Sequence, residues 1–183
     1  GALTHGIIHL GWAIDAGSAW MICEGLAYLN FCHLGVDEEK LEKDVYAELS
    51  PMDSFVRVAK SWEADNLKAE WVDKAKAAFD ESFHPELVSA GFQWEVSKVL
   101  TEAHPVATQL PEWLNEKSVD ELWHELYRDV TYLYLATRDA DGNGNFLVLH
   151  LLTSLWGLEQ VCRLIDNGPT MMKVTRNALN QYY

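Results

Sequence analysis

The chain has 183 residues, of which 49% are hydrophobic and 23% are charged, and its formal charge is −14 at pH 7. This length and composition predict a globular chain with a substantial core. The acidic balance argues against nucleic acid and anionic membranes as partners, because both attract a basic face. The three cysteines show no CxxC spacing, so neither a disulfide framework nor a zinc-thiolate site is predicted. We therefore expect a reducing, cytoplasmic compartment.

The first part of the chain, residues 6–36, is apolar over about the length of a bilayer span. Four polar residues interrupt it: Asp15, Glu24, His9 and Asn30. Neither a basic flank nor a cleavage site accompanies it, so we expect no membrane span and no signal peptide. The pattern predicts one buried core helix over residues 4–34 that ends at Gly35, with Gly17 as a point where it could bend. The chain opens inside this pattern without a capping residue, which suggests that it begins in mid-protein.

A mixed-charge run follows at residues 37–43 and is typical of a solvated helix face. Next, Ser50 is placed as an N-cap, with Pro51 at the first helical position and Asp53 in the first turn. These three residues predict a helix that begins at Pro51 and runs toward Ala64.

The middle of the chain also has helical spacing of its apolar residues. We expect one helix over residues 66–80 and another that begins near His84. Pro105 and Pro111 bracket a loop.

Cap and turn signals delimit the next helices. Ser118 and Glu121 have the spacing of a capping box, which predicts a helix to about Thr137. Residues 139–145 are rich in turn formers and precede an apolar helix over residues 146–165. The same turn matches part of a calcium loop, but a histidine stands where the bidentate glutamate belongs, so an ordinary turn is favoured.

Two-residue alternation is nowhere sustained, and we find no repeat or linker. The final segment, residues 170–183, has a helical pattern without a stop signal. We therefore predict an all-α protein, a multi-helix bundle in which residues 1–183 form a single helical domain or the central fragment of a longer one.

Histidines on the two most apolar helices are the strongest sign of chemistry. His5 and His9 are four residues apart, which places both imidazoles on one helix face. His150 lies in the middle of the other apolar helix. Its one-turn neighbours are small or hydroxylic: Thr153, Ser154 and Gly157. We expect the histidine-bearing faces of both helices to leave open volume and to line a cavity. The alternative is that each histidine is simply hydrogen-bonded in the core.

The remaining candidates carry less information. We expect the tryptophans to be core residues, although one or two that face a cavity would suit a flat aromatic ligand. They include Trp12, Trp20, Trp94, Trp123 and Trp156. The motifs of zinc proteases, serine hydrolases, phosphate loops and dinucleotide-binding folds are absent from the sequence.

Both histidine helices carry a family resemblance. Residues 1–13 and 24–27 resemble the stretch of questin oxidase-like proteins that reads His-Pro-x-Ile-His-Leu-Gly-Tyr-Ala and then Glu-Ala-Leu-Ala. Residues 146–154 resemble the later Phe-x-x-x-His-x-x-Thr-Ser helix of the same family. Gly6 replaces the usual proline of the first motif, and Trp12 replaces the usual tyrosine.

The resemblance implies an oxygen-dependent oxidoreductase, a monooxygenase or dioxygenase, acting on an aromatic or quinone-type small molecule in a helix-lined pocket. It implies a non-haem Fe(II) site with His5, His9 and His150 as metal ligands, of which His9 and His150 are the catalytic residues. Glu24 would orient a ligand or serve as a core partner. NADPH is a cofactor that the resemblance alone suggests. Family chains extend further on both sides, so this chain would be a middle fragment or a reduced relative.

An alternative of a different class is a non-catalytic helical module that binds a hydrophobic ligand or a partner chain. In that case the histidines are merely hydrogen-bonded. Exposed apolar helix faces would then be covered by a second copy, in a homo-oligomer, or by further chain segments.

Overall fold

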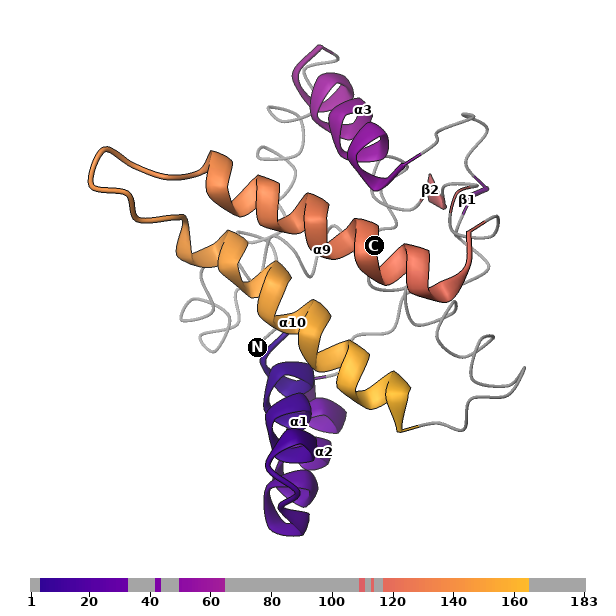
Figure 1. The fold of residues 1–183 in the computed structure, drawn as a ribbon, viewed down its shortest axis with the longest axis vertical. Coiled ribbons are helices and arrows are strands. Elements are labelled where there is room, and N and C mark those ends of the chain that lie inside the picture. Colours follow the sequence, from indigo (N-terminus) through magenta and orange to yellow (C-terminus); the bar gives the residue numbers. More distant parts are fainter. Residues whose placement is uncertain are drawn as a thin grey trace, which may run out of the picture. The chain divides into compact units, whose positions relative to one another are not determined.

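A computed structural model of the chain describes residues 4–32, 42–43, 50–64, 109–110, 113 and 117–164. Helices account for about four-fifths of these residues, so the all-α prediction is confirmed. The helices are α1 (His5–Asp15), α2 (Ala19–Cys32), α3 (Pro51–Ala64), α9 (Val119–Ala136) and α10 (Phe146–Arg163) (Figure 1). The helices predicted over residues 66–80, from His84 and over residues 170–183 lie outside the described residues. The chain divides into two compact units, which are taken in turn.

The first unit described contains α1, α2, α9 and α10. Helix α1 ends in a Schellman motif, in which the amide of Gly17 donates to the Ile14 carbonyl and that of Ser18 donates to the Ala13 carbonyl. Gly17 has a φ of +61°, a conformation that glycine adopts without strain. The Ser18 hydroxyl then accepts from the amide of Met21 and caps the start of α2.

The prediction of one helix over residues 4–34 is therefore wrong, since the chain reverses at Gly17 and forms an antiparallel hairpin of α1 and α2 (Figure 1). Glycines let the two helices approach closely. A Cβ atom on Gly6 would lie 2.8 Å from the Cα of Leu29, and one on Gly25 would lie 2.8 Å from the Cα of Leu10. A larger residue at either glycine would force the helices apart.

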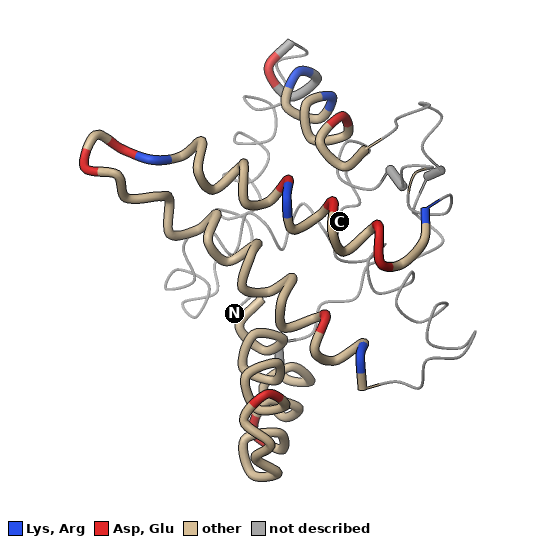
Figure 2. The backbone as a smooth tube through the Cα atoms, viewed as in Figure 1, with Lys and Arg blue, Asp and Glu red and all other residues tan. Residues whose placement is uncertain are grey.

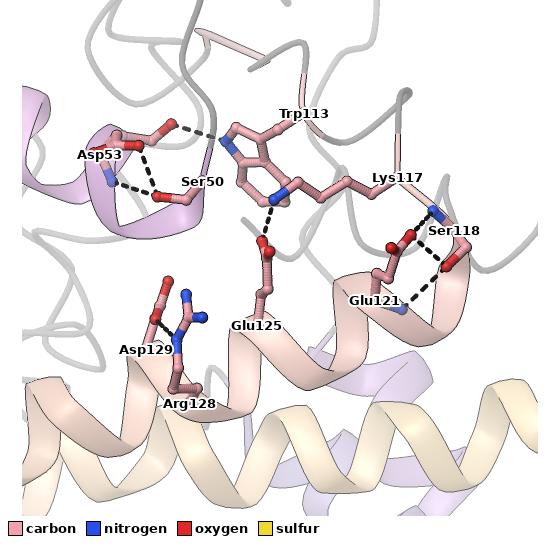
Figure 3. Close-up of polar contacts among 10 residues, drawn as sticks. Ser50, Asp53, Trp113, Lys117, Ser118, Glu121, Glu125, Arg128 and Asp129 are labelled. Carbon is pink, nitrogen blue, oxygen red and sulfur yellow. Dashed lines mark hydrogen bonds and ion pairs between the residues drawn. The ribbon is translucent and has the colours of Figure 1, made fainter.

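Helix α9 begins at the predicted capping box. The Ser118 hydroxyl accepts from the Glu121 amide, and the Glu121 carboxylate accepts from the Ser118 amide and hydroxyl (Figure 3). These hydrogen bonds hold the pKa of Glu121 below its usual value, because they stabilise the ionised carboxylate. The apolar face of α9 is buried through Leu122, Leu126 and Val130.

Helices α9 and α10 form a second antiparallel hairpin around the predicted turn at residues 139–145 (Figure 1). One carboxylate oxygen of Asp139 accepts from the amides of Asp141 and Asn143, so it organises the turn. The side chain of Asn145 accepts from two amides in the first turn of α10 and caps the helix. These contacts are those of an ordinary turn, as the sequence favoured.

Polar side chains also join α9 to α10. The Tyr127 hydroxyl donates to Glu159 over 2.6 Å, and the other carboxylate oxygen of Glu159 accepts from Arg163 one turn along α10. This carboxylate raises the pKa of Arg163, because it accepts a hydrogen bond from the guanidinium and attracts its charge.

The other unit contains α3 and a pair of two-residue parallel strands, β1 (Glu42–Lys43) and β2 (Gln109–Leu110). The helical expectation for residues 37–43 is thus wrong at residues 42–43. The start of α3 is as predicted: the Ser50 hydroxyl accepts from the Asp53 amide and donates to its carboxylate (Figure 3). The indole of Trp113, which is fully buried, donates to Ser54 over 3.0 Å.

Within the described ranges, every helix is too short or too polar to cross a bilayer. Charged residues along α1 and α2 are few and acidic, and most of the length of α10 is uncharged (Figure 2).

Candidate functional site

Two glycines set how α1 crosses α10. A Cβ atom on Gly11 would overlap the backbone of Gly157, and one on Gly157 would lie 2.5 Å from the Ile7 carbonyl oxygen. The small residues beside His150 were expected to leave open volume, but Gly157 instead faces the backbone of α1. The hydroxyl of Ser154, which is also buried, donates to a carbonyl of its own helix. Close helix packing therefore uses the space that the sequence suggested for a cavity.

The crossing brings His5 of α1 and His150 of α10 together, and we call these two residues the imidazole pair. Their Nε2 atoms are 3.2 Å apart and their ring centroids 4.8 Å apart. His5 is exposed and His150 is half-buried. Of the two histidines on α1, His5 is therefore the one whose imidazole meets that of His150.

The orientation of His150 is fixed from its own helix. Its Nδ1 lies 2.7 Å from the Phe146 carbonyl oxygen, which only accepts, so Nδ1 carries a proton and donates. The Phe146 ring packs edge-on against the imidazole at a centroid distance of 4.7 Å. In the neutral ring, the lone pair is therefore on Nε2 and points toward His5. Phe146 stands in the motif that carries the family resemblance, but its contact with His150 was not predicted, although a spacing of four residues on a helix indicates one.

His9 lies next to Glu24 of α2 instead. Its Nε2 is 3.9 Å from a Glu24 carboxylate oxygen and is a buried ring nitrogen without a hydrogen-bond partner. The sequence placed Glu24 on the continuation of one long helix, whereas the α1–α2 hairpin is what brings it beside His9. Glu24 is exposed, so it is not a core partner.

The three predicted ligands thus occupy two neighbouring turns of α1 and one turn of α10. Among the described residues, no three side chains of the histidine, cysteine or carboxylate type gather closely enough to surround one metal ion. The structure brings His5 and His150 together and places His9 with Glu24.

Tryptophans flank the same crossing. The indoles of Trp12 and Trp156 have centroids 4.9 Å apart at an angle of 49°. Trp12 and Trp20 are 55% and 77% exposed, so their expected core role is wrong, whereas Trp123 is buried as predicted. Trp94 lies outside the described residues.

The fold and the site together define a class of protein. It is an all-α protein in which two apolar helices cross and bring two imidazoles together. The chain belongs to the questin oxidase-like family, which it matches over residues 1–182. The match extends the resemblance from the two histidine helices to nearly the whole chain and indicates an oxidoreductase. Neither a curated protein nor a solved structure matches the chain significantly.

Proposed function

We propose that this chain contributes the histidine site of an oxygen-dependent oxidoreductase that acts on an aromatic or quinone-type small molecule. The observation that carries the proposal is the 3.2 Å separation between the Nε2 atoms of His5 and His150. Family membership supplies the reaction class.

The imidazole pair fits a metal ion. Imidazole ligands bind first-row metals at about 2.0–2.1 Å, so two nitrogens 3.2 Å apart would subtend an angle of about 100° at a shared ion. The hydrogen bond from Nδ1 of His150 to the Phe146 carbonyl is the outer contact that usually orients a ligating imidazole. His5 and His150 are therefore the residues that would hold Fe(II), which when bound would activate dioxygen.

His9 and Glu24 would serve proton transfer beside this pair. The partnerless Nε2 of His9 is free to accept a proton or to hydrogen-bond a polar group of the substrate. The Glu24 carboxylate is exposed and lies 3.9 Å from this nitrogen, so it would pass the proton on to solvent. In this scheme His150 and His5 hold the metal and His9 acts on the substrate.

Replacing His150 tests the proposal. In the full chain, we expect His150→Ala to lose both stoichiometric uptake of ferrous iron and oxygen consumption with a quinone substrate, while helical content measured by circular dichroism stays near that of the original protein. His124→Ala, which removes an exposed histidine from α9, is the matched control and should keep both activities.

Full iron uptake and full oxygen consumption in His150→Ala would contradict the proposal. Measuring oxygen consumption with and without NADPH distinguishes a monooxygenase from a dioxygenase. A monooxygenase needs two electrons from NADPH to reduce the second oxygen atom to water, whereas a dioxygenase places both oxygen atoms in the product.

A second candidate function is a non-catalytic module that binds a partner chain through α2. Trp20 and Phe31 of α2 are 77% and 86% exposed, and their spacing of eleven positions, about three helical turns, places both on one helix face. Large exposed apolar residues of this kind often mark interaction surfaces. On this alternative, the original chain itself takes up no stoichiometric iron, so the same metal analysis separates the two candidates.

A further inference from the structure

The turn between α9 and α10 contains the pair Asn143–Gly144 (Figure 1). A backbone nitrogen can attack the side-chain amide of the residue before it, and glycine favours this attack because it has no Cβ atom to obstruct it. The Asn143 side chain is exposed and, within the described part of the chain, has no hydrogen-bond partner. The amide nitrogen of Gly144 likewise donates to none of the described residues. Both groups that would react are therefore available.

The neighbouring pairs of the same turn are engaged instead. The amide of Gly142, which follows Asp141, donates to the Asp139 carbonyl over 3.0 Å. The side-chain oxygen of Asn145 accepts from two amides in the first turn of α10, so this side chain is held in place as the helix cap. The hydrogen bonds of the turn thus distinguish Asn143 from the residues on both sides of it.

We propose that Asn143 is a site of spontaneous deamidation. The Gly144 nitrogen forms a bond to the Cγ atom of Asn143, the side-chain amide leaves as ammonia with the proton of that nitrogen, and a succinimide ring results. Water then opens the ring at either of its two carbonyl carbons. The product is aspartate, or isoaspartate, in which the main chain runs through the former side chain. Either product carries one more negative charge than the original residue.

The product changes the tip of the α9–α10 hairpin. Gly144 lies so close to Tyr134 that a Cβ atom on this glycine would be 2.3 Å from the Cε2 atom of the ring. Isoaspartate adds a carbon atom to the main chain directly before Gly144, so it shifts this contact. The new carboxylate also lies in the same short turn as those of Asp139 and Asp141, and like charges repel. We therefore expect the modified turn to be less firmly held.

The test is to incubate the full chain under native conditions, digest it, and separate the peptides by liquid chromatography with mass spectrometry. The mass shows the exchange of an amide for an acid, and the elution position separates aspartate from isoaspartate. We expect Asn143 to convert roughly tenfold faster than Asn145 or Asn30, since each of these two precedes a phenylalanine. Asn143→Gln should remain unmodified, because its longer side chain would have to close a larger ring.

Asp141→Asn is the matched control, because it creates a second asparagine–glycine pair in the same turn. In the folded protein, position 141 should convert more slowly than Asn143, since the Gly142 nitrogen is bonded to Asp139. In denaturing urea, which removes that hydrogen bond, the two positions should convert at equal rates. Equal rates in the folded variant, or conversion of Asn143 no faster than that of Asn145 in the original protein, would each overturn the proposal. The second comparison does not depend on whether the variant folds.

Discussion

Helix α10 packs against its two neighbours, α1 and α9, by different means. The contact with α1 depends on two glycines, because Gly11 and Gly157 have no side chains and their backbones meet directly. The contact with α9 depends on side chains that are present, since Tyr127 of α9 donates a hydrogen bond to Glu159 of α10.

The difference shows that the contact with α1 fixes the spacing between helices, whereas the contact with α9 fixes which side chains pair. Backbone contact at Gly11 and Gly157 leaves little freedom in the spacing of α1 and α10, so it sets the separation of His5 and His150. A hydrogen bond between long side chains such as Tyr127 and Glu159 tolerates small shifts of the helices. The imidazole pair therefore lies on the side of α10 where the helix spacing is more tightly determined.

The largest effect should come from adding a side chain at the crossing. Gly11→Val places a branched group where only the backbone of Gly157 fits, and we expect a loss of about 3 kcal/mol in the free energy of unfolding. It should also separate the imidazole pair and lower ferrous iron uptake. Urea unfolding and metal analysis measure the two effects. Ala27→Val, at an exposed position of α2, is the control and should cost about 0.6 kcal/mol through helix propensity alone. Equal stability of these two variants would show that the crossing can relax.

A smaller effect is expected on the α9 side. Tyr127→Phe removes the hydrogen bond to the Glu159 carboxylate without changing the shape of the ring, and we expect it to cost about 2 kcal/mol. Iron uptake should remain at the level of the original protein, because the α1–α10 spacing is unaffected. Loss of iron uptake in Tyr127→Phe would mean that both faces of α10 position the histidines.

The smallest effect concerns the start of α9. Ser118→Ala removes the N-cap and should cost about 1 kcal/mol near neutral pH. Because folding lowers the pKa of Glu121 below its usual value of 4.5, the stabilising contribution of this carboxylate is present above that pH. It is lost as the pH falls through the lower, folded-state pKa. Urea unfolding at several pH values should therefore show the difference between Ser118→Ala and the original protein shrinking in acid, and a constant difference would contradict this account.

Local signals predicted much of the fold. The capping box at Ser118 and the start of α3 at Ser50 each depend on residues within one turn, so the sequence is sufficient to place them. The reversal at Gly17 was predicted only as a bend. A Schellman glycine there is followed at once by the capping hydroxyl of Ser18, with no polar loop between the helices, and the apolar pattern continues unbroken across the turn.

The site was predictable in its residue types but not in its pairings. Imidazoles within apolar helices singled out His5, His9 and His150 from the sequence alone. Which of the first two meets His150 depends on how α1 is rotated against α10, and the contact of Gly11 with Gly157 decides that rotation. Such a contact joins residues far apart in the chain, and no local pattern encodes it.

The hydrogen bond between His5 and His150 closes a separation of 145 residues, which has a consequence for folding kinetics. The α1–α2 hairpin needs only its short turn at Gly17 to form, whereas the imidazole pair must wait until the intervening chain has returned α10 to α1. We therefore expect the α1–α2 hairpin to gain structure early in refolding and the imidazole pair to form among the last contacts. An ion that bridges the pair would then slow unfolding by holding together the two most distant parts of this unit.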